Sequence, residues 1–401
     1  MRPVSLRRGL LAAACLLLGL FHCEPASAYS WMIKHGLSRC NACHVDPSGG
    51  ETLTLMGRAH AERLLSFGGD HAGEPSASSR LLFGAVPELP DVQLGGSYRH
   101  LLLYTASEGG APSDVAHFPM QADLYGAANL DLFMVGGSLG VARGIEGSAH
   151  VRGAQLNREL GAGWIVLSRN HFVGARIGEQ SLLRLGRLNL PFGVRVPEHV
   201  LWVREATRTD RESDQQHGLA FSHASGRLRL EAMAVAGNFQ IYPDRYRERG
   251  YSASVEYLLG PTHAVGLSSL LLRANEDRFT QARRTVRHAH GVNARLGLSP
   301  EWAILTELDV LKEGGRGVGY AGLLQVDYEP LRGLHFMLSG EGVDQGALDA
   351  APTTSPGNGE ARLGLWGSVA WYLLAHFELR LDGVQRQESP FRLQAQVHFF
   401  L

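Results

Sequence analysis

The chain ends in the stretch FRLQAQVHFFL, residues 391–401, and this stretch decides the fold class. Apolar residues occupy every second position from Phe391 to Leu401, and arginine, glutamine and histidine fill most of the positions between them. Successive side chains of a β-strand point to opposite faces of the sheet, so the alternation predicts a strand with one apolar and one polar face.

The same alternation recurs upstream, in residues 377–382 and 301–310. A soluble sandwich would alternate too, so the connections decide between the two folds. Counted back from the C-terminus, tight turns alternate with longer polar loops, which is typical of outer-membrane barrels with short periplasmic turns. Residues 91–401 are therefore predicted to form an all-β transmembrane barrel of about 16 antiparallel strands that ends in the periplasm.

Two further features suit a barrel. The chain has 49 glycines, and they are scattered rather than clustered. Aromatic residues near apparent strand ends are expected to form the two interfacial girdles of such a barrel. These residues are Tyr98, Tyr104, Trp164, Trp302, Tyr320, Trp371 and Tyr372.

Residues 1–28 have the features of a secretory signal peptide. Three arginines precede an apolar stretch from Gly9 to Phe21, and small residues surround Ala28. This apolar stretch is shorter than the roughly 20 residues of a membrane-spanning helix. We expect the mature chain to begin at Tyr29, which removes Cys15 and Cys23.

The two remaining cysteines lie in the pentapeptide CNACH, from Cys40 to His44. Two thiols on one turn, followed directly by an imidazole, are the pattern that attaches a c-type haem: Cys40 and Cys43 form thioethers and His44 ligates the iron. We expect one covalent haem c, bound by a small, mainly helical segment over residues 29–67.

Three other interpretations of this motif remain open. A zinc site would need a second pair of ligands, but no other cysteine survives the removal of the signal peptide. A thioredoxin-like dithiol would need a βαβ setting, which is not visible nearby. A structural disulfide between Cys40 and Cys43 would leave His44 without a role.

The sixth ligand of the haem iron is not fixed by the sequence. His35 is favoured, because a short segment that runs directly into the attachment turn stays close to the haem with little loop to order. The alternatives are Met32 upstream and Met56 and His60 downstream, the last two on one face of a predicted helix. A methionine ligand would raise the reduction potential.

Two further segments connect these parts. Residues 68–90 are rich in glycine, proline and serine and are interpreted as a linker. The long stretch between Pro191 and Gln216 carries many charges of both signs, so it either folds into the barrel as a constriction or meets a partner outside. Its acidic residues could hold a cation such as Fe(II) through oxygen ligands.

Composition limits the function classes. The net charge is −1 at pH 7, so a nucleic-acid partner is not expected. We identify no nucleophile, phosphate loop or paired carboxylates, and therefore no catalytic residues. If the chain has an enzymatic activity, it is that of a metal oxidase or reductase acting by electron transfer.

In its architecture the chain resembles the monohaem cytochrome-porin fusions, among them outer-membrane iron oxidases. The resemblance rests on Cys40, Cys43, His44, Pro47, Gly57 and Arg58 and on the order of signal, haem motif, linker and barrel. It implies a haem that plugs a pore and passes electrons between an extracellular donor or acceptor and periplasmic carriers. This chain departs from the family in ending on Leu401 rather than on an aromatic residue, and in carrying Asp46.

Two functions follow as hypotheses. The first is an outer-membrane cytochrome that exchanges electrons with something outside the cell, extracellular metal ions included, and with a soluble periplasmic cytochrome or another carrier. The second is a diffusion porin, or a structural barrel, with a redox-inert N-terminal plug. In both, the barrel lies in outer-membrane lipid, and its haem segment and C-terminus are reached from the periplasm.

Overall fold

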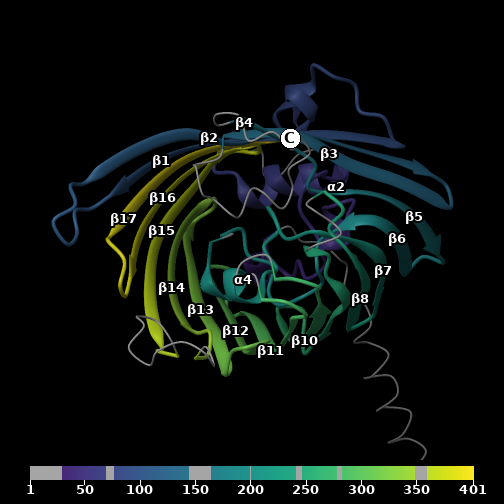
Figure 1. Cartoon of the computed structure of the whole chain (residues 1–401). Coiled ribbons are helices and arrows are strands. Elements are labelled where there is room, and N and C mark those ends of the chain that lie inside the picture. The colour runs from purple at the N-terminus through teal and green to yellow at the C-terminus, as the bar shows by residue number, and fades with distance from the viewer. Residues whose placement is uncertain are drawn as a thin grey trace, which may run out of the picture.

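The computed structural model describes residues 29–68, 76–143, 164–198, 200–240, 246–277, 282–347 and 359–401. The predicted signal peptide, with Cys15 and Cys23, lies outside these residues. The described part is a closed antiparallel β-barrel around a short N-terminal segment (Figure 1).

A single sheet closes on itself where the first strand pairs with the last. Its strands are β1 (Val92–Thr105), β2 (Asp114–Leu130), β3 (Phe133–Arg143), β4 (Trp164–Leu167), β5 (His171–Ile177), β6 (Ser181–Leu188), β7 (Gln216–Ser225), β8 (Leu228–Gly237), β9 (Arg249–Leu258), β10 (His263–Arg273), β11 (Val286–Gly297), β12 (Trp302–Glu313), β13 (Val318–Leu331), β14 (Leu334–Asp344), β15 (Arg362–Leu374), β16 (Phe377–Arg386) and β17 (Arg392–Phe400). Strands β4 and β5 both pair with β3, one with each half of it. They fill one position between them, so the barrel is a 16-strand barrel, as predicted.

The alternation in the sequence separates the outside of the barrel from its lumen. Along β12, Leu308 is 55% exposed, whereas its neighbours Glu307 and Asp309 are 2% and 0% exposed. Along β17, Phe399 is exposed and His398 is buried. Apolar residues therefore face lipid and polar residues face inward, as in outer-membrane barrels with polar interiors.

One of the predicted girdle residues faces the other way. Tyr372 is only 2% exposed, and its ring packs inside the barrel with centroids 6.3 Å from Trp31 and 5.7 Å from His335. Its neighbour Trp371 is exposed on the outside. The girdle prediction was wrong for Tyr372, because adjacent residues of a strand point to opposite faces.

The two rims of the barrel differ. At one rim the connections are short: residues 131–132, 178–180, 226–227, 259–262, 298–301, 332–333 and 375–376. The start of β1 and the end of β17 lie at this same rim. The strand ends at the opposite rim are joined by longer connections, among them those that follow β6, β8 and β10.

Short helices make up the N-terminal segment, as predicted. They are η1 (Ser30–His35), η2 (Cys40–Ala42), α2 (Leu55–His60) and η3 (Ala61–Leu65), followed by η4 (Ala77–Ser79) and η5 (Leu81–Gly84) before β1. Another helix, α4 (Trp202–Thr207), lies in the connection between β6 and β7. In the part of the chain that the structure describes, no helix has the length and apolar character needed to cross a membrane.

Candidate functional site

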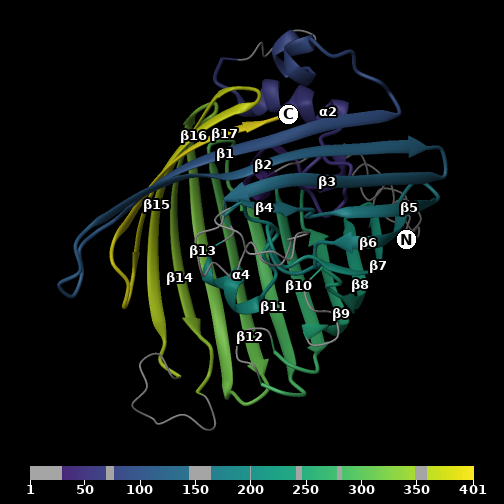
Figure 2. The ribbon, with the colours of Figure 1, turned by 45° about the horizontal axis from the view of Figure 1, so that its top comes forward.

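The segment of residues 29–67, called the plug below, lies in the lumen at the rim of short turns (Figure 2). Lys34 Nζ lies 2.6 Å from Asp327 Oδ2 and 2.8 Å from Glu329 Oε2, near the end of β13. Arg39 donates to the carbonyl of Gly226 in the turn between β7 and β8. Polar contacts with a strand end and with a turn thus hold the plug at one end of the barrel.

The CNACH turn is closed by its own backbone. The amides of Cys43 and His44 donate to the carbonyl of Cys40 at 3.1 and 2.9 Å. Thr54 then ties the turn to the next helix: its amide donates to the carbonyl of Cys43, and its hydroxyl donates to that of Ala42. The same hydroxyl caps α2 by accepting from the amide of Gly57, so the turn and α2 form one unit.

Gly57 and Arg58 each have a structural role in this unit. A Cβ at position 57 would collide with the carbonyl of Cys43, so only glycine lets α2 approach the attachment turn this closely. Arg58 is buried, donates to the carbonyl of Leu94 in β1, and lies 3.2 Å from Glu88 Oε1. The pair therefore joins the CNACH turn to the first strand of the barrel.

We expect Gly57→Ala to loosen the plug. Alanine favours a helix over glycine by about 1 kcal/mol, but overpacking against a backbone atom costs about 1–3 kcal/mol, so the net effect is destabilising. Protease should cleave the plug faster in the folded variant than in the parent. Gly340→Ala is the matched control, because nothing lies within 4 Å of a Cβ there. Equal cleavage of both variants would contradict the close contact.

Asp46 anchors the turn after the motif to the barrel wall. Its carboxylate pairs with the buried Arg184 of β6 and accepts from Asn170 Nδ2 at 2.7 Å. It also accepts from the amide of Ser48 at 2.7 Å. Burial alone would raise the pKa of Asp46, but Arg184, Ser48 and Asn170 lower it below its ordinary value. Asp46 is thus a charged anchor.

The residues of the motif fit a covalent haem. Cys40 and Cys43 are both buried and are not joined to each other. The Nδ1 atom of His44 is buried without a hydrogen-bond partner. Burial, and then the charge of Arg211, lowers the pKa of His44 to about 4. A neutral imidazole with an unpartnered nitrogen can ligate a metal.

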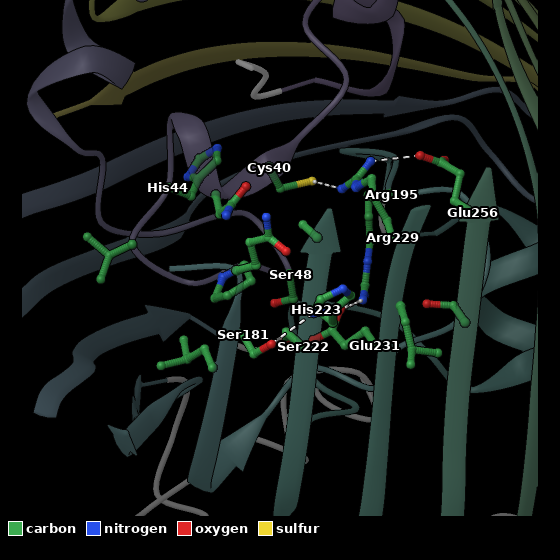
Figure 3. A pocket seen from close by; sticks show the side chains of 18 of the residues that line it. Cys40, His44, Ser48, Ser181, Arg195, Ser222, His223, Arg229, Glu231 and Glu256 are labelled. Atoms are coloured by element: carbon green, nitrogen blue, oxygen red, sulfur yellow. Dashed lines mark hydrogen bonds and ion pairs between the residues drawn. The ribbon is translucent and has the colours of Figure 1, made fainter. Parts of the chain in front are cut away.

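Space is available beside these residues. A cavity of ≈ 280 Å³ is lined by Cys40, Asn41 and His44, close to the lower end of the range of about 300–1,000 Å³ typical of ligand pockets (Figure 3). A second cavity of ≈ 160 Å³ also reaches His44, and Tyr29 and Arg195 line both cavities. His44 therefore lies between two adjoining spaces in the lumen.

The structure brings none of the four predicted distal ligands to either cavity. His35 is turned to the wall, with Nε2 3.1 Å from Glu329 Oε2. Met32 packs in the buried core, and Met56 is 52% exposed. His60 has a buried Nδ1 without a hydrogen-bond partner.

Sequence reasoning missed three residues at the larger cavity. Met134 of β3 and Arg229 of β8 line it from the wall, and Arg195 lines it from the connection between β6 and β7. Arg229 Nη2 lies 3.5 Å from the sulfur of Cys40, and its Nη1 lies 2.7 Å from Glu256 Oε1. For Met134 and Arg229 the one available signal was their inward position in the alternation of their strands, and for Arg195 it was the charge of the long connection. Nothing in the sequence shows which of these residues meet the motif.

The long connection between β6 and β7 folds into the lumen, one of the two outcomes that the sequence left open. Phe192, Leu201 and Trp202 are buried in the same core as Trp31 of the plug. The loop also touches the plug directly, because Arg211 donates to the carbonyl of Gly49.

Two glutamates of this loop pair with arginines, whereas Asp210 accepts a hydrogen bond from Ser213. Glu198 lies 2.6 Å from Arg380, and Glu212 lies 2.7 Å from Arg169. Within the described ranges, no group of three or more His, Cys, Asp or Glu residues has the arrangement of a metal site. The structure therefore gives no support for a bound Fe(II) in this loop.

Comparisons with known proteins agree on the barrel. No family model matches this sequence, and no curated protein matches it significantly. Among solved structures, OmpF of Salmonella typhi in complex with daunomycin superposes with a TM-score of 0.57 at 12% identity, over 77% of this chain and 97% of that chain. An OmpT loop-deletion mutant of Vibrio cholerae gives 0.56 at 10%, over 77% and 99%. An anion-selective porin from Comamonas acidovorans gives 0.54 at 14%, over 77% and 99%.

At these identities the likeness shows the fold. The chain has the fold of outer-membrane porins, and its exterior is apolar. The barrel fold and the lipid-facing exterior place the protein in a bacterial outer membrane.

Proposed function

We propose that this protein is an outer-membrane c-type cytochrome fused to a porin-like barrel. In this proposal it transfers electrons between an extracellular donor or acceptor, with iron as one candidate, and periplasmic carriers. The observation that carries the proposal is the CNACH turn in the lumen, with two unbridged thiols and an unpartnered His44 nitrogen beside a cavity.

The proposal assigns each residue a task. Cys40 and Cys43 would hold one haem covalently, and His44 would be its proximal ligand. The bound haem would supply a one-electron redox centre inside the insulating layer. The protein's own contribution is to seat the turn rigidly, through Thr54 and Asp46, and to enclose it.

A packed lumen favours electron transfer over the passage of solutes. The plug, the loop of residues 189–215 and inward side chains of the wall share one buried apolar core, which includes Trp31, Trp202 and Leu305. Electrons tunnel through packed protein, whereas solutes need an open channel. The likeness to porins favours a second candidate function, a diffusion porin with a redox-inert plug.

The orientation in the membrane is part of the proposal. Outer-membrane barrels have their short turns in the periplasm and their longer loops outside. We assign the rim that carries the plug and both barrel ends to the periplasm. A soluble periplasmic carrier would then meet the barrel at the end where His44 lies, and an extracellular partner would meet the long loops.

The decisive experiment is to express the protein with a haem-attachment apparatus and to place it in liposomes that enclose a redox dye. Mass spectrometry should show one haem added at Cys40 and Cys43, and a pyridine haemochrome spectrum should confirm its type. An impermeant reductant outside should then reduce the enclosed dye. A chain without attached haem would contradict the proposal. Leakage of both dye and reductant would instead support the function of a diffusion porin.

A further inference from the structure

A cationic patch lies on the outside of the barrel near the rim of long loops. Its members are Arg249 at the start of β9, Arg273 at the end of β10, and His288 and His290 near the start of β11. All four occupy outward positions of their strands, because the residues that alternate with them, such as Ser252, Leu272 and Ala289, are buried. The patch thus faces the surroundings of the barrel.

The two arginines are direct cross-strand partners in the register of β9 and β10. Both are exposed, and neither guanidinium has a hydrogen bond or ion pair among the described residues. Paired residues on neighbouring strands have Cα atoms about 5 Å apart, which is shorter than the Debye length of about 8 Å at physiological ionic strength. Like charges in this position destabilise a sheet unless an anion lies between them.

On the outer face of the three described strands, the protein supplies no such anion. The outward positions of Arg249–Leu258, His263–Arg273 and Val286–Gly297 carry no aspartate or glutamate at all. Three polar side chains are linked by hydrogen bonds beside the arginines. Tyr251 Oη lies 3.1 Å from Ser269 Oγ, and Ser269 Oγ lies 3.0 Å from His290 Nδ1. Three adjacent strands therefore present donors and cations without a carboxylate.

The position along the barrel identifies the kind of anion. Farther along the same strands, the outward residues are exposed and apolar, among them Val265, Leu267 and Val292. Those residues face acyl chains, so the patch lies at the level where the apolar belt ends and head groups begin. Guanidinium groups match phosphate oxygens with two parallel hydrogen bonds.

We propose that this patch binds the phosphorylated head group of an outer-leaflet lipid, lipid A. The acyl chains would lie along the apolar exterior of β9–β11, and a phosphate would lie between Arg249 and Arg273. The site is separate from the haem motif, so it holds whether or not electrons pass through the barrel.

The test is titration of the detergent-solubilised protein with bisphosphorylated lipid A, read by native mass spectrometry. Near a membrane surface, each arginine contributes about 1 kcal/mol to lipid binding, so the double variant R249Q/R273Q should bind about 30-fold more weakly. The matched control is Arg332→Gln, an exposed arginine on the opposite rim. If the double variant does not run as a folded barrel on an unheated gel, Arg273→Gln alone serves, with about a 5-fold loss expected.

Two further arms distinguish the source of the phosphate. Dephosphorylated lipid A should bind the parent as weakly as bisphosphorylated lipid A binds the double variant. Inorganic phosphate alone should not displace bound lipid A, because it gains nothing from the apolar exterior. Equal affinity of R249Q/R273Q and Arg332→Gln, equal binding of the dephosphorylated lipid, or displacement by free phosphate would each overturn the proposal.

Discussion

Replacing His44 with alanine should reduce electron transfer across the liposome membrane to the rate of protein-free liposomes. The substitution removes the proximal ligand, while the barrel strands, which make no use of this side chain in their pairing, stay intact. The enclosed dye should remain oxidised with an impermeant reductant outside. The visible spectrum should change at the same time, because the haem iron would lose its proximal histidine.

The control for this prediction is His263→Gln. His263 lies on the barrel rim, is hydrogen-bonded to Thr262, and lines neither cavity beside His44. The His263→Gln variant should transfer electrons at the parent's rate. Both variants should run as folded barrels on unheated gels. Dye reduction by His44→Ala at the parent's rate would show that the motif does not carry the electrons.

Replacing Lys34 with methionine should release the plug from the wall. The ammonium of Lys34 is fully buried and neutralises Asp327 and Glu329, which are also buried. Removing one partner of a buried ionic cluster leaves uncompensated charge and costs about 3–5 kcal/mol. The free energy of unfolding of the plug, followed by the fluorescence of the buried Trp31, should fall by that amount.

The chain offers its own control and its own rescue for this variant. Lys312 is the only other lysine in the sequence, and its ammonium donates to a loop carbonyl rather than to carboxylates. Lys312→Met should therefore cost far less. Neutralising both acids as well, in K34M/D327N/E329Q, should recover much of the loss, because no buried charge is then unpaired. A similar cost for both lysine variants would contradict the role of the cluster.

The sequence alone was sufficient for the barrel, because the signal there is local. Side chains alternate with a period of two, so FRLQAQVHFFL reports both of its faces without reference to any other strand. The lengths of successive connections likewise predicted which connections lie at the rim of short turns and which at the rim of long loops. Tyr372 shows the limit: an aromatic residue near a strand end resembles a girdle residue until its position in the alternation is counted.

The CNACH motif was also visible from the sequence, because its two thiols and its imidazole lie within five residues. The candidate distal ligands were not decided, and His35 shows why. Its imidazole contacts Glu329, which lies 294 positions away in the chain. The proximity of His35 to Cys40 in the sequence could not reveal that His35 would contact a glutamate near the end of β13.

The tertiary structure alone decided how the plug, the long loop and the wall meet. Asp46 looked like a departure from a family pattern, and it is an anchor only because β6 places Arg184 against it, 138 positions away. Closing a barrel brings residues together across hundreds of positions, and no periodicity records which inward side chains face one another. Local sequence therefore determined each strand and the attachment turn, while the partners inside the lumen, Met134, Arg195 and Arg229 among them, depended on closure.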